Sequence, residues 1–384
     1  MGATSDSPKI SVLVPICNVE KYLDECLESV QAQTLSDIEV ICINDGSKDG
    51  SLGIIQSFCR RDPRFRLIDK PNTGYGDSMN RGLDAARGEY VAILESDDYL
   101  DSDALEYMYD EAVRGDLEVF KCNFWLYWSD ARPERMYRRN MYLSFASPEM
   151  VLMGAHRPAD YPYSFWGKAS IWSAIYKRSF LDDNSIRFLP TPGASYQDSS
   201  FTFKVLACAD RVAYSSRAFL HYRQDNENSS VNSKGKVYCT CDEHAEMVRF
   251  LNEDRPDLKP ELDPIRARLK FLNYRWNYDR LGEQFKGEFL RRFSEEMREE
   301  IERGSIPADY FSGAMMIRLR KSPELGHFKY FYDEEIEEVR QIAFDPKFYA
   351  TRRLCETSPS KLDTIREYFN AGGIKYILKV ILNR

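Results

Sequence analysis

The sequence has little that would suit secretion or a membrane. No apolar run approaches the roughly 20 residues that a membrane-spanning helix needs, and the N-terminal stretch MGATSDSPK lacks the apolar region of a signal peptide. The cysteines show no CxxC spacing and no second Cys/His pair at zinc spacing, and Cys239 and Cys241 are the only close pair. We therefore expect a cytoplasmic protein without disulfides or structural zinc.

Several nucleotide- and substrate-binding motifs are also missing. No G-x-G-x-x-G follows the first apolar run, and no G-x-x-x-x-G-K-[ST] occurs, which disfavours nicotinamide dehydrogenases and P-loop enzymes. No serine stands in a G-x-S-x-G context, so serine hydrolysis has no support. The net charge of −8 and the absence of a basic stripe give no sign of nucleic-acid binding.

What the sequence does contain is an alternation of strands and helices from residue 9 to about 123. The apolar runs ISVLVP, IEVICIND, FRLID and YVAIL are typical of strands covered on both faces. Between the first two runs, Leu23, Cys26, Leu27 and Val30 recur at helical spacing. This alternation predicts an α/β fold with a mixed, mostly parallel sheet flanked by helices.

The second part of the chain has a different character. After the polar stretch HYRQDNENSSVNSKGK the sequence is mainly helical and rich in charge. We therefore predict one domain over residues 1–232 and a helical C-terminal domain over residues 233–384, with an acceptor, oligomer or membrane-surface role. The last segment, GGIKYILKVILNR, has apolar residues at helical spacing and predicts a helix that docks on the protein itself or lies on a membrane surface.

An acidic cluster stands where such a fold binds its ligands, beyond the carboxyl ends of the strands. Three polar segments fall there: 15–18, 44–49 and 95–98. Glu95, Asp97 and Asp98 repel one another unless a cation or solvent relieves them, and Mg²⁺ or Mn²⁺ prefers such oxygen ligands. The alternative is that Ser96 or Asp97 caps the next helix and that the other acids are solvated.

Four further residues are candidates for the site. Asp198 in YQDSSF is either a helix cap or a general base toward a hydroxyl. His221 is a third metal ligand, a phosphate donor or a structural histidine, and Arg223 beside it offers a fork for phosphate. Arg81 faces either a phosphate or solvent.

Taken together, these segments resemble the inverting glycosyltransferases of family 2, which have the GT-A fold, of the type that builds bacterial surface polysaccharides or glycoconjugates. The resemblance covers about residues 8–232. It rests on SVLVPICNVEKYLDECLESVQAQTL, EVICINDGSKDGS, NTGYGDSMNRGLDAARGEYVAILESDD, WSAIYKRSFL and YQDSSF, in this order and spacing.

The resemblance implies roles for single residues. Asp198 takes the place of the catalytic base, and Trp172 and Gln197 lie on the acceptor side. Asp97 and Asp98 hold the metal and the diphosphate, with His221 as a candidate third ligand. The residues that the resemblance puts along the donor are Pro15, Ile16, Asn18, Asp45 (against the base, usually uracil), Asn72, Gly74, Asn80 and Asp97. From their own place and chemistry we also expect Arg81, Ser96 and Arg223 there.

The chain departs from the family pattern at three positions. Glu95 stands where the family commonly has Asp, Gln197 where it often has Glu, and Cys17 where it has Tyr. None of these changes removes a residue that the chemistry requires.

From the resemblance we expect a hexosyltransferase-type enzyme that depends on Mn²⁺ or Mg²⁺. It moves a sugar from a nucleoside-diphosphate sugar, usually a UDP-sugar, to a hydroxyl of a glycan, lipid-linked or protein-linked acceptor. Peripheral contact with the inner face of the cell membrane and a homo-oligomer stay open. The alternatives are a non-catalytic nucleotide-sugar-binding or scaffold subunit, and a sugar nucleotidyltransferase, although VPICNVEKY is not the Gly-rich basic loop that the latter needs.

Overall fold

A computed structural model describes residues 7–129, 140–143, 148–194, 196–227, 236–306 and 333–357. The chain divides into two compact units. The first comprises residues 1–127 and 140–269, and the second comprises residues 128–139 and 270–384. The predicted boundary near residue 232 stays a prediction, and the terminal segment GGIKYILKVILNR lies outside the described residues.

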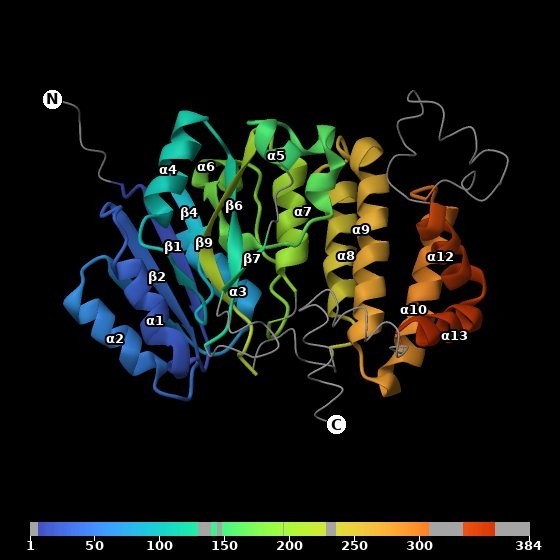
Figure 1. Ribbon diagram of the computed structural model, residues 1–384, viewed down its shortest axis with the longest axis horizontal. Helices are drawn as coiled ribbons and strands as arrows, with labels where there is room; N and C mark the ends of the chain where they lie inside the picture. The colour runs from blue at the N-terminus through green and yellow to red at the C-terminus, as the bar shows by residue number, and fades with distance from the viewer. Residues whose placement is uncertain are drawn as a thin grey trace, which may run out of the picture. The chain divides into compact units, whose positions relative to one another are not determined.

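The first unit is built around one mixed sheet (Figure 1). Its strands are β1 (Ile10–Ile16), β2 (Ile38–Asp45), β3 (Phe65–Lys70), β4 (Tyr90–Ile93), β5 (Tyr99–Leu100), β6 (Val119–Tyr127), β7 (Asn140–Leu143), β8 (Ala174–Lys177) and β9 (Val212–Arg223). They lie in the order β3-β2-β1-β4-β8-β6-β9-β5, with β7 beside β6. The strands β3, β2, β1 and β4 run parallel to one another, whereas β8 runs antiparallel to both β4 and β6.

Helices alternate with these strands and cover the sheet. They are α1 (Glu20–Gln31), α2 (Ser51–Arg61), α3 (Tyr75–Ala85), α4 (Ala104–Arg114), α5 (Pro148–Leu152), α6 (Arg178–Asp183), α7 (Asp198–Cys208) and α8 (Cys239–Arg249). In α1 the buried side chains are Leu23, Cys26, Leu27 and Val30, as their spacing predicts. Together with β1 and β2, which are buried along their whole length, they form one hydrophobic core.

The remaining described helices are α9 (Lys259–Arg280), α10 (Glu283–Glu302), α12 (Asp333–Phe344) and α13 (Pro346–Thr357). In the second unit a buried ammonium group, that of Lys270, lies 2.8 Å from carboxylate oxygens of both Glu296 and Glu300. Because each of these charges has an opposite partner, the network holds the helices together without an isolated buried ion. The predicted helical character of the C-terminal part is confirmed.

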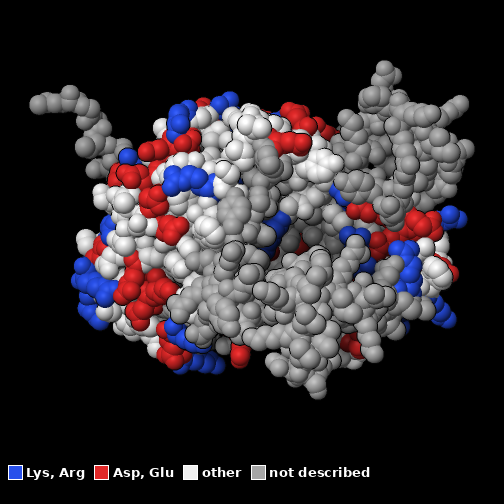
Figure 2. All heavy atoms as spheres, in the orientation of Figure 1, with Lys and Arg blue, Asp and Glu red and all other residues white. Residues whose placement is uncertain are grey.

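None of the described helices combines the length and the apolar character that crossing a membrane requires. Over the described part of the face in Figure 2, basic and acidic side chains are interspersed. The charge on that face is therefore mixed, as the composition suggests.

Candidate active site

The three predicted polar segments meet at one edge of the sheet. Because β1 is parallel to both β2 and β4, the carboxyl ends of these strands share that edge. The Cys17 sulfur lies 3.5 Å from the carbonyl oxygen of Asp45, and the Cys26 sulfur lies 3.6 Å from that of Glu95. The segments after β1, β2 and β4 are thus joined into one rim.

At the end of β2, Asp45 uses its carboxylate to hold the turn before α3. The backbone amides of Thr73 and Gly74 donate to it at 2.8 and 3.0 Å, and the buried Lys70 ammonium pairs with it. Asn72 donates to the Asp45 carbonyl oxygen at 3.0 Å. The Asp45 carboxylate, predicted to contact the base of the donor, is therefore already bound by this chain's own groups.

The first motif divides between core and surface. Pro15 and Ile16 are buried in β1, and Ile16 belongs to the hydrophobic core. Asn18 is exposed with a φ of 52°, and its side-chain oxygen accepts a hydrogen bond of 2.8 Å from the amide of Lys48. Only Asn18 of these three predicted cleft residues presents a side chain outside the core.

In α3, the two predicted donor contacts are bound within the protein. The amide of Asn80 donates to the carbonyl oxygen of Phe188 at 2.9 Å and accepts from its backbone amide at 2.8 Å. Arg81 is half-exposed and pairs with Asp77 at 2.9 Å. Asn80 therefore fixes the backbone of residue 188, and the arginine lies in a surface ion pair.

The acidic loop after β4 holds two carboxylates, Asp97 and Asp98, that differ in burial and in hydrogen bonding. Asp97 accepts a hydrogen bond of 2.7 Å from the side chain of Asn226, and Ser96 between the acids is buried. Asp98 is 1% exposed; its Oδ1 accepts from the Arg223 backbone amide at 2.8 Å. Burial, and then the charge of Asp97, raise the pKa of Asp98 well above its ordinary value.

Arg223 and His221, on β9, are both bound to other side chains of the protein. The Arg223 side chain is 2% exposed, pairs with Glu25 and donates through Nε to the Asp97 carbonyl oxygen at 2.7 Å. The ring of His221 stacks on Tyr99 at 4.2 Å, and its Nε2 lies 3.0 Å from an Asp101 oxygen. Burial of both side chains leaves no open fork for phosphate on Arg223 and turns His221 toward Asp101, so the structure brings neither to the role predicted for it.

The residues present fit a cation through Asp97 and Asp98 alone. Within the described ranges, no group of three or more His, Cys, Asp or Glu side chains is arranged to hold a metal ion. However, the buried Oδ2 atom of Asp98 accepts no hydrogen bond from any described residue. A buried carboxylate oxygen without a partner is costly, and a divalent ion would satisfy it while the substrate supplied the remaining oxygen ligands.

Asp198, the predicted base, is the first residue of α7. It is partly buried, and burial raises the pKa of its carboxyl group to about 6, while the nearby Lys168 ammonium and the backbone amides at the helix start oppose that rise. A carboxylate with a pKa close to neutrality can both hold and release a proton near pH 7. This shift is the property expected of a general base.

Two lysines and an aromatic shelf stand beside Asp198. The Lys168 ammonium lies 4.1 Å from the ring centre of Tyr222 and 5.7 Å from that of Trp172, which is buried. The Lys168 residue is exposed, but the protein atoms around its ammonium group remove part of its hydration and so lower its pKa. Lys121 is buried, donates to the Ser170 carbonyl oxygen, and has its pKa lowered to about 7 by burial.

Sequence reasoning missed two parts of this site. Glu95 accepts a hydrogen bond of 2.6 Å from the hydroxyl of Tyr75, and burial raises the pKa of its carboxyl group to about 8. Tyr75 lies in the segment NTGYGDSMNRGL, but nothing in the sequence indicated that its hydroxyl bonds to Glu95. Lys168 likewise carried no signal, because its charge acts on Asp198 although the two residues lie well apart in the sequence.

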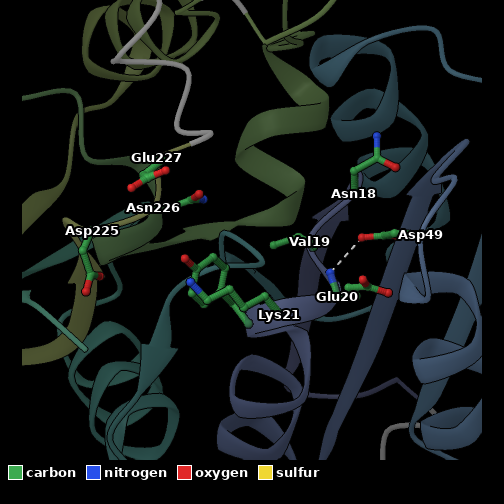
Figure 3. Close-up of a pocket in the computed structure, with 9 residues that line it drawn as sticks. Asn18, Val19, Glu20, Lys21, Asp49, Asp225, Asn226 and Glu227 are labelled. Carbon is green, nitrogen blue, oxygen red and sulfur yellow. Dashed lines mark hydrogen bonds between the residues drawn. The ribbon is translucent and has the colours of Figure 1, made fainter. Parts of the chain in front are cut away.

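A pocket of about 410 Å³ opens next to this rim (Figure 3). It lies between the start of α1 and the residues that follow β9. Its lining residues are Asn18, Val19, Glu20, Lys21, Tyr22, Asp49, Asp225, Asn226 and Glu227. Asn226 lines the pocket and also donates a hydrogen bond to Asp97, so the pocket adjoins the acidic loop.

Comparison with known proteins finds similarity to glycosyltransferases over the part of the chain that forms this rim. Residues 11–197 match the family model for "Glycosyl transferase family 2". The chain is 33% identical over 230 residues to the uncharacterized glycosyltransferase EpsJ of Bacillus subtilis, which covers 58% of this chain and 62% of that relative. It is 31% identical over 229 residues to the putative glycosyltransferase EpsH of the same organism, covering 57% and 61%. The chain thus spans about three fifths of the length of these relatives.

Among solved structures, the chain resembles residues 1–349 of S. aureus TarS in complex with UDP-GlcNAc. The TM-score is 0.61 at 19% sequence identity, and the match covers 90% of this chain and 92% of that one. This likeness shows the GT-A fold. Residues 11–197 are therefore similar to glycosyltransferases of family 2.

Proposed function

We propose that this chain is a metal-dependent, inverting glycosyltransferase of the hexosyltransferase type. It takes a sugar from a nucleoside-diphosphate sugar, a UDP-sugar, and transfers it to a hydroxyl of a glycan, lipid-linked or protein-linked acceptor. The observation that carries the proposal is the pairing at one rim of two chemically different acids. Asp98 has a buried oxygen without a partner among the described residues, and Asp198 has a pKa of about 6.

In this proposal Asp97 and Asp98 hold the divalent ion and, through it, the donor diphosphate. When bound, such an ion supplies the positive charge that stabilises the departing nucleoside diphosphate. Asn226 keeps the Asp97 carboxylate in place at 2.7 Å. The pocket beside Asn226 accommodates part of the donor.

The chemical step uses Asp198 as the only base. Its carboxylate accepts the proton of the acceptor hydroxyl, and the acceptor oxygen bonds to the anomeric carbon from the face opposite the diphosphate. The bond between that carbon and the phosphate oxygen breaks, so the configuration inverts. Since the pKa of Asp198 is about 6, the carboxylate is charged at pH 7 and ready to accept the proton.

The neighbouring lysine supports this role electrostatically. The Lys168 ammonium, seated over Tyr222, favours the charged form of Asp198 and so opposes the effect of burial. Without it, the carboxylate would be protonated to a larger extent at neutral pH. Because "chondroitin synthase" is among the related names, at 40% identity over 112 residues to the Escherichia coli protein, we propose assembly of a surface polysaccharide or glycoconjugate as the pathway.

The test is UDP release from a panel of UDP-sugars, with Mn²⁺ and with EDTA, followed by NMR of the product's anomeric configuration. We expect one donor to be consumed only with the metal and its linkage to be inverted. Retained configuration would contradict the role of Asp198. If no donor is consumed although UDP binds, the chain is instead a nucleotide-sugar-binding scaffold subunit.

A further inference from the structure

The turn before α3 and the segment that leads into α7 touch backbone to backbone. Gly74 has a φ of 99°, and a Cβ atom there would lie 2.8 Å from both the Gly193 nitrogen and the Thr191 carbonyl oxygen. At Gly76 a Cβ atom would lie 2.1 Å from the Leu189 carbonyl oxygen. Only glycine at these two places allows residues 189–193 to lie this close to the start of α3.

A single carbonyl oxygen joins the two segments. The backbone amide of Tyr75 donates to the oxygen of Gly193 at 3.0 Å, and Nε2 of Gln197 donates to the same oxygen at 3.0 Å. Gln197 is 2% exposed, and its Nε2 also donates to the Thr191 hydroxyl oxygen at 2.9 Å. The residue immediately before Asp198 is therefore fixed to the loop that precedes it.

Tyr75 carries this connection to the acidic loop. Its hydroxyl donates to Glu95 at 2.6 Å, two residues before Asp97. Its ring meets the ring of Phe188 edge to face at 6.0 Å, and Phe188 stacks on Phe201 of α7 at 4.0 Å. One tyrosine thus contacts the loop proposed to hold the diphosphate and the aromatic stack under the helix that begins with Asp198.

We propose that Tyr75 and Gln197 are positioning residues that set the base relative to the acidic loop. We name the group of Gly74, Tyr75, Thr191, Gly193 and Gln197 the Gly193 clamp. This inference rests on the proposed function, because it assigns the clamp to the placement of Asp198 against a donor held at Asp97 and Asp98. Neither residue touches the reacting atoms. Both act through the backbone of the 188–197 segment.

The clamp accounts for glutamine at residue 197, where the pattern of the resembling family leads us to expect glutamate. Nε2 of Gln197 faces the carbonyl oxygens of Gly193 and Thr191, at 3.0 and 3.4 Å. Carbonyl oxygens only accept hydrogen bonds, so the atom that faces them must be a donor. A carboxylate at residue 197 would meet these oxygens as a second set of acceptors in a buried place.

The catalytic test uses the variants Tyr75→Phe and Gln197→Glu, which keep the size of each side chain. With the donor identified from the UDP-sugar panel, we expect kcat to fall roughly tenfold to hundredfold, because small displacements of a reacting group have effects of this size. The KM for the donor and the affinity for UDP should stay within about threefold, since donor contacts remain. Tyr90→Phe is the matched control: it removes another buried tyrosine hydroxyl, bonded to the Leu117 carbonyl oxygen at 2.9 Å.

The structural test is hydrogen exchange of the backbone amides over residues 186–198, which needs no substrate. We expect faster exchange in both clamp variants and exchange at the wild-type rate in Tyr90→Phe. Unchanged exchange in an active protein, or a raised KM with unchanged kcat, would overturn the clamp alone. If the wild-type protein consumes no donor, the proposed function fails and the positioning role fails with it.

Discussion

Replacing Asp198 by Asn should abolish transfer and at the same time stabilise the folded protein. The amide keeps the shape of the side chain at the start of α7 but cannot accept the proton of an acceptor hydroxyl. Loss of a general base lowers kcat by about 10²- to 10⁴-fold. The affinity for UDP should not change, because Asp198 has no part in holding the diphosphate. A fall of this size with donor binding intact identifies a residue that acts on the acceptor.

The gain in stability follows from the raised pKa. Burial moves the pKa of Asp198 from 3.8 to about 6 in the folded state, so the charged form destabilises the fold above pH 6. The shift corresponds to about 3 kcal/mol, which partial exposure and solvent screening reduce to about 1–2 kcal/mol. Asp198→Asn should therefore unfold with a higher free energy at pH 8, and the difference should disappear below about pH 4, where the acid is protonated in both states.

Urea unfolding at pH 8 and pH 4 measures this difference, and UDP release measures the rate. The matched control is Asp182→Asn on α6, whose carboxylate forms surface ion pairs with Arg178 and Arg187 at 3.2 and 3.0 Å. That variant should be active and either unchanged or slightly less stable. Transfer by Asp198→Asn within threefold of the wild-type rate, or a loss of stability at pH 8, would refute the reasoning.

Three further changes test the surroundings. Lys168→Gln removes the charge that lowers the pKa of Asp198, so the acidic limb of the rate profile between pH 5 and 9 should move to higher pH. An unchanged acidic limb would show that Lys168 does not affect the pKa of Asp198. Asp98→Asn should raise thermal stability at pH 8, where burial disfavours the charged carboxyl, and should abolish the further stabilisation by UDP with Mn²⁺; retained stabilisation would exclude Asp98 as a ligand. Gly76→Ala should cost about 1–3 kcal/mol in urea unfolding, because the new Cβ atom meets a carbonyl oxygen at 2.1 Å; Gly53→Ala, with nothing within 4 Å, should be neutral or stabilising.

The fold was predictable because its signals are local. The apolar runs of β1 and β2 and the four-residue pattern of α1 each lie within a dozen residues, and all three are buried as that spacing requires. The position of the acidic loop followed from the rule that parallel strands share a carboxyl edge. The antiparallel insertion of β8 between β4 and β6 had no such local signal.

The roles of single side chains were harder to predict because they depend on distant partners. Asn80 stood in a motif of the donor side, yet its amide is bound to the backbone of Phe188, 108 positions away. Arg223 was expected to meet phosphate, but its guanidinium is enclosed by Glu25 and the rings of Tyr22 and Tyr127. Motif residues such as Asn80 and Arg223 hold the backbone of the rim in place. The chemistry that we propose is carried by the acids at this rim, Asp97, Asp98 and Asp198.

A calorimetric titration of UDP, with and without Mn²⁺ and with GDP in parallel, tests the central claim most directly. The account predicts that UDP binds tightly only when the metal is present, because the diphosphate and the acids of the 97–98 loop repel each other without it. Binding of UDP with equal affinity in EDTA would contradict a metal–diphosphate site at this loop.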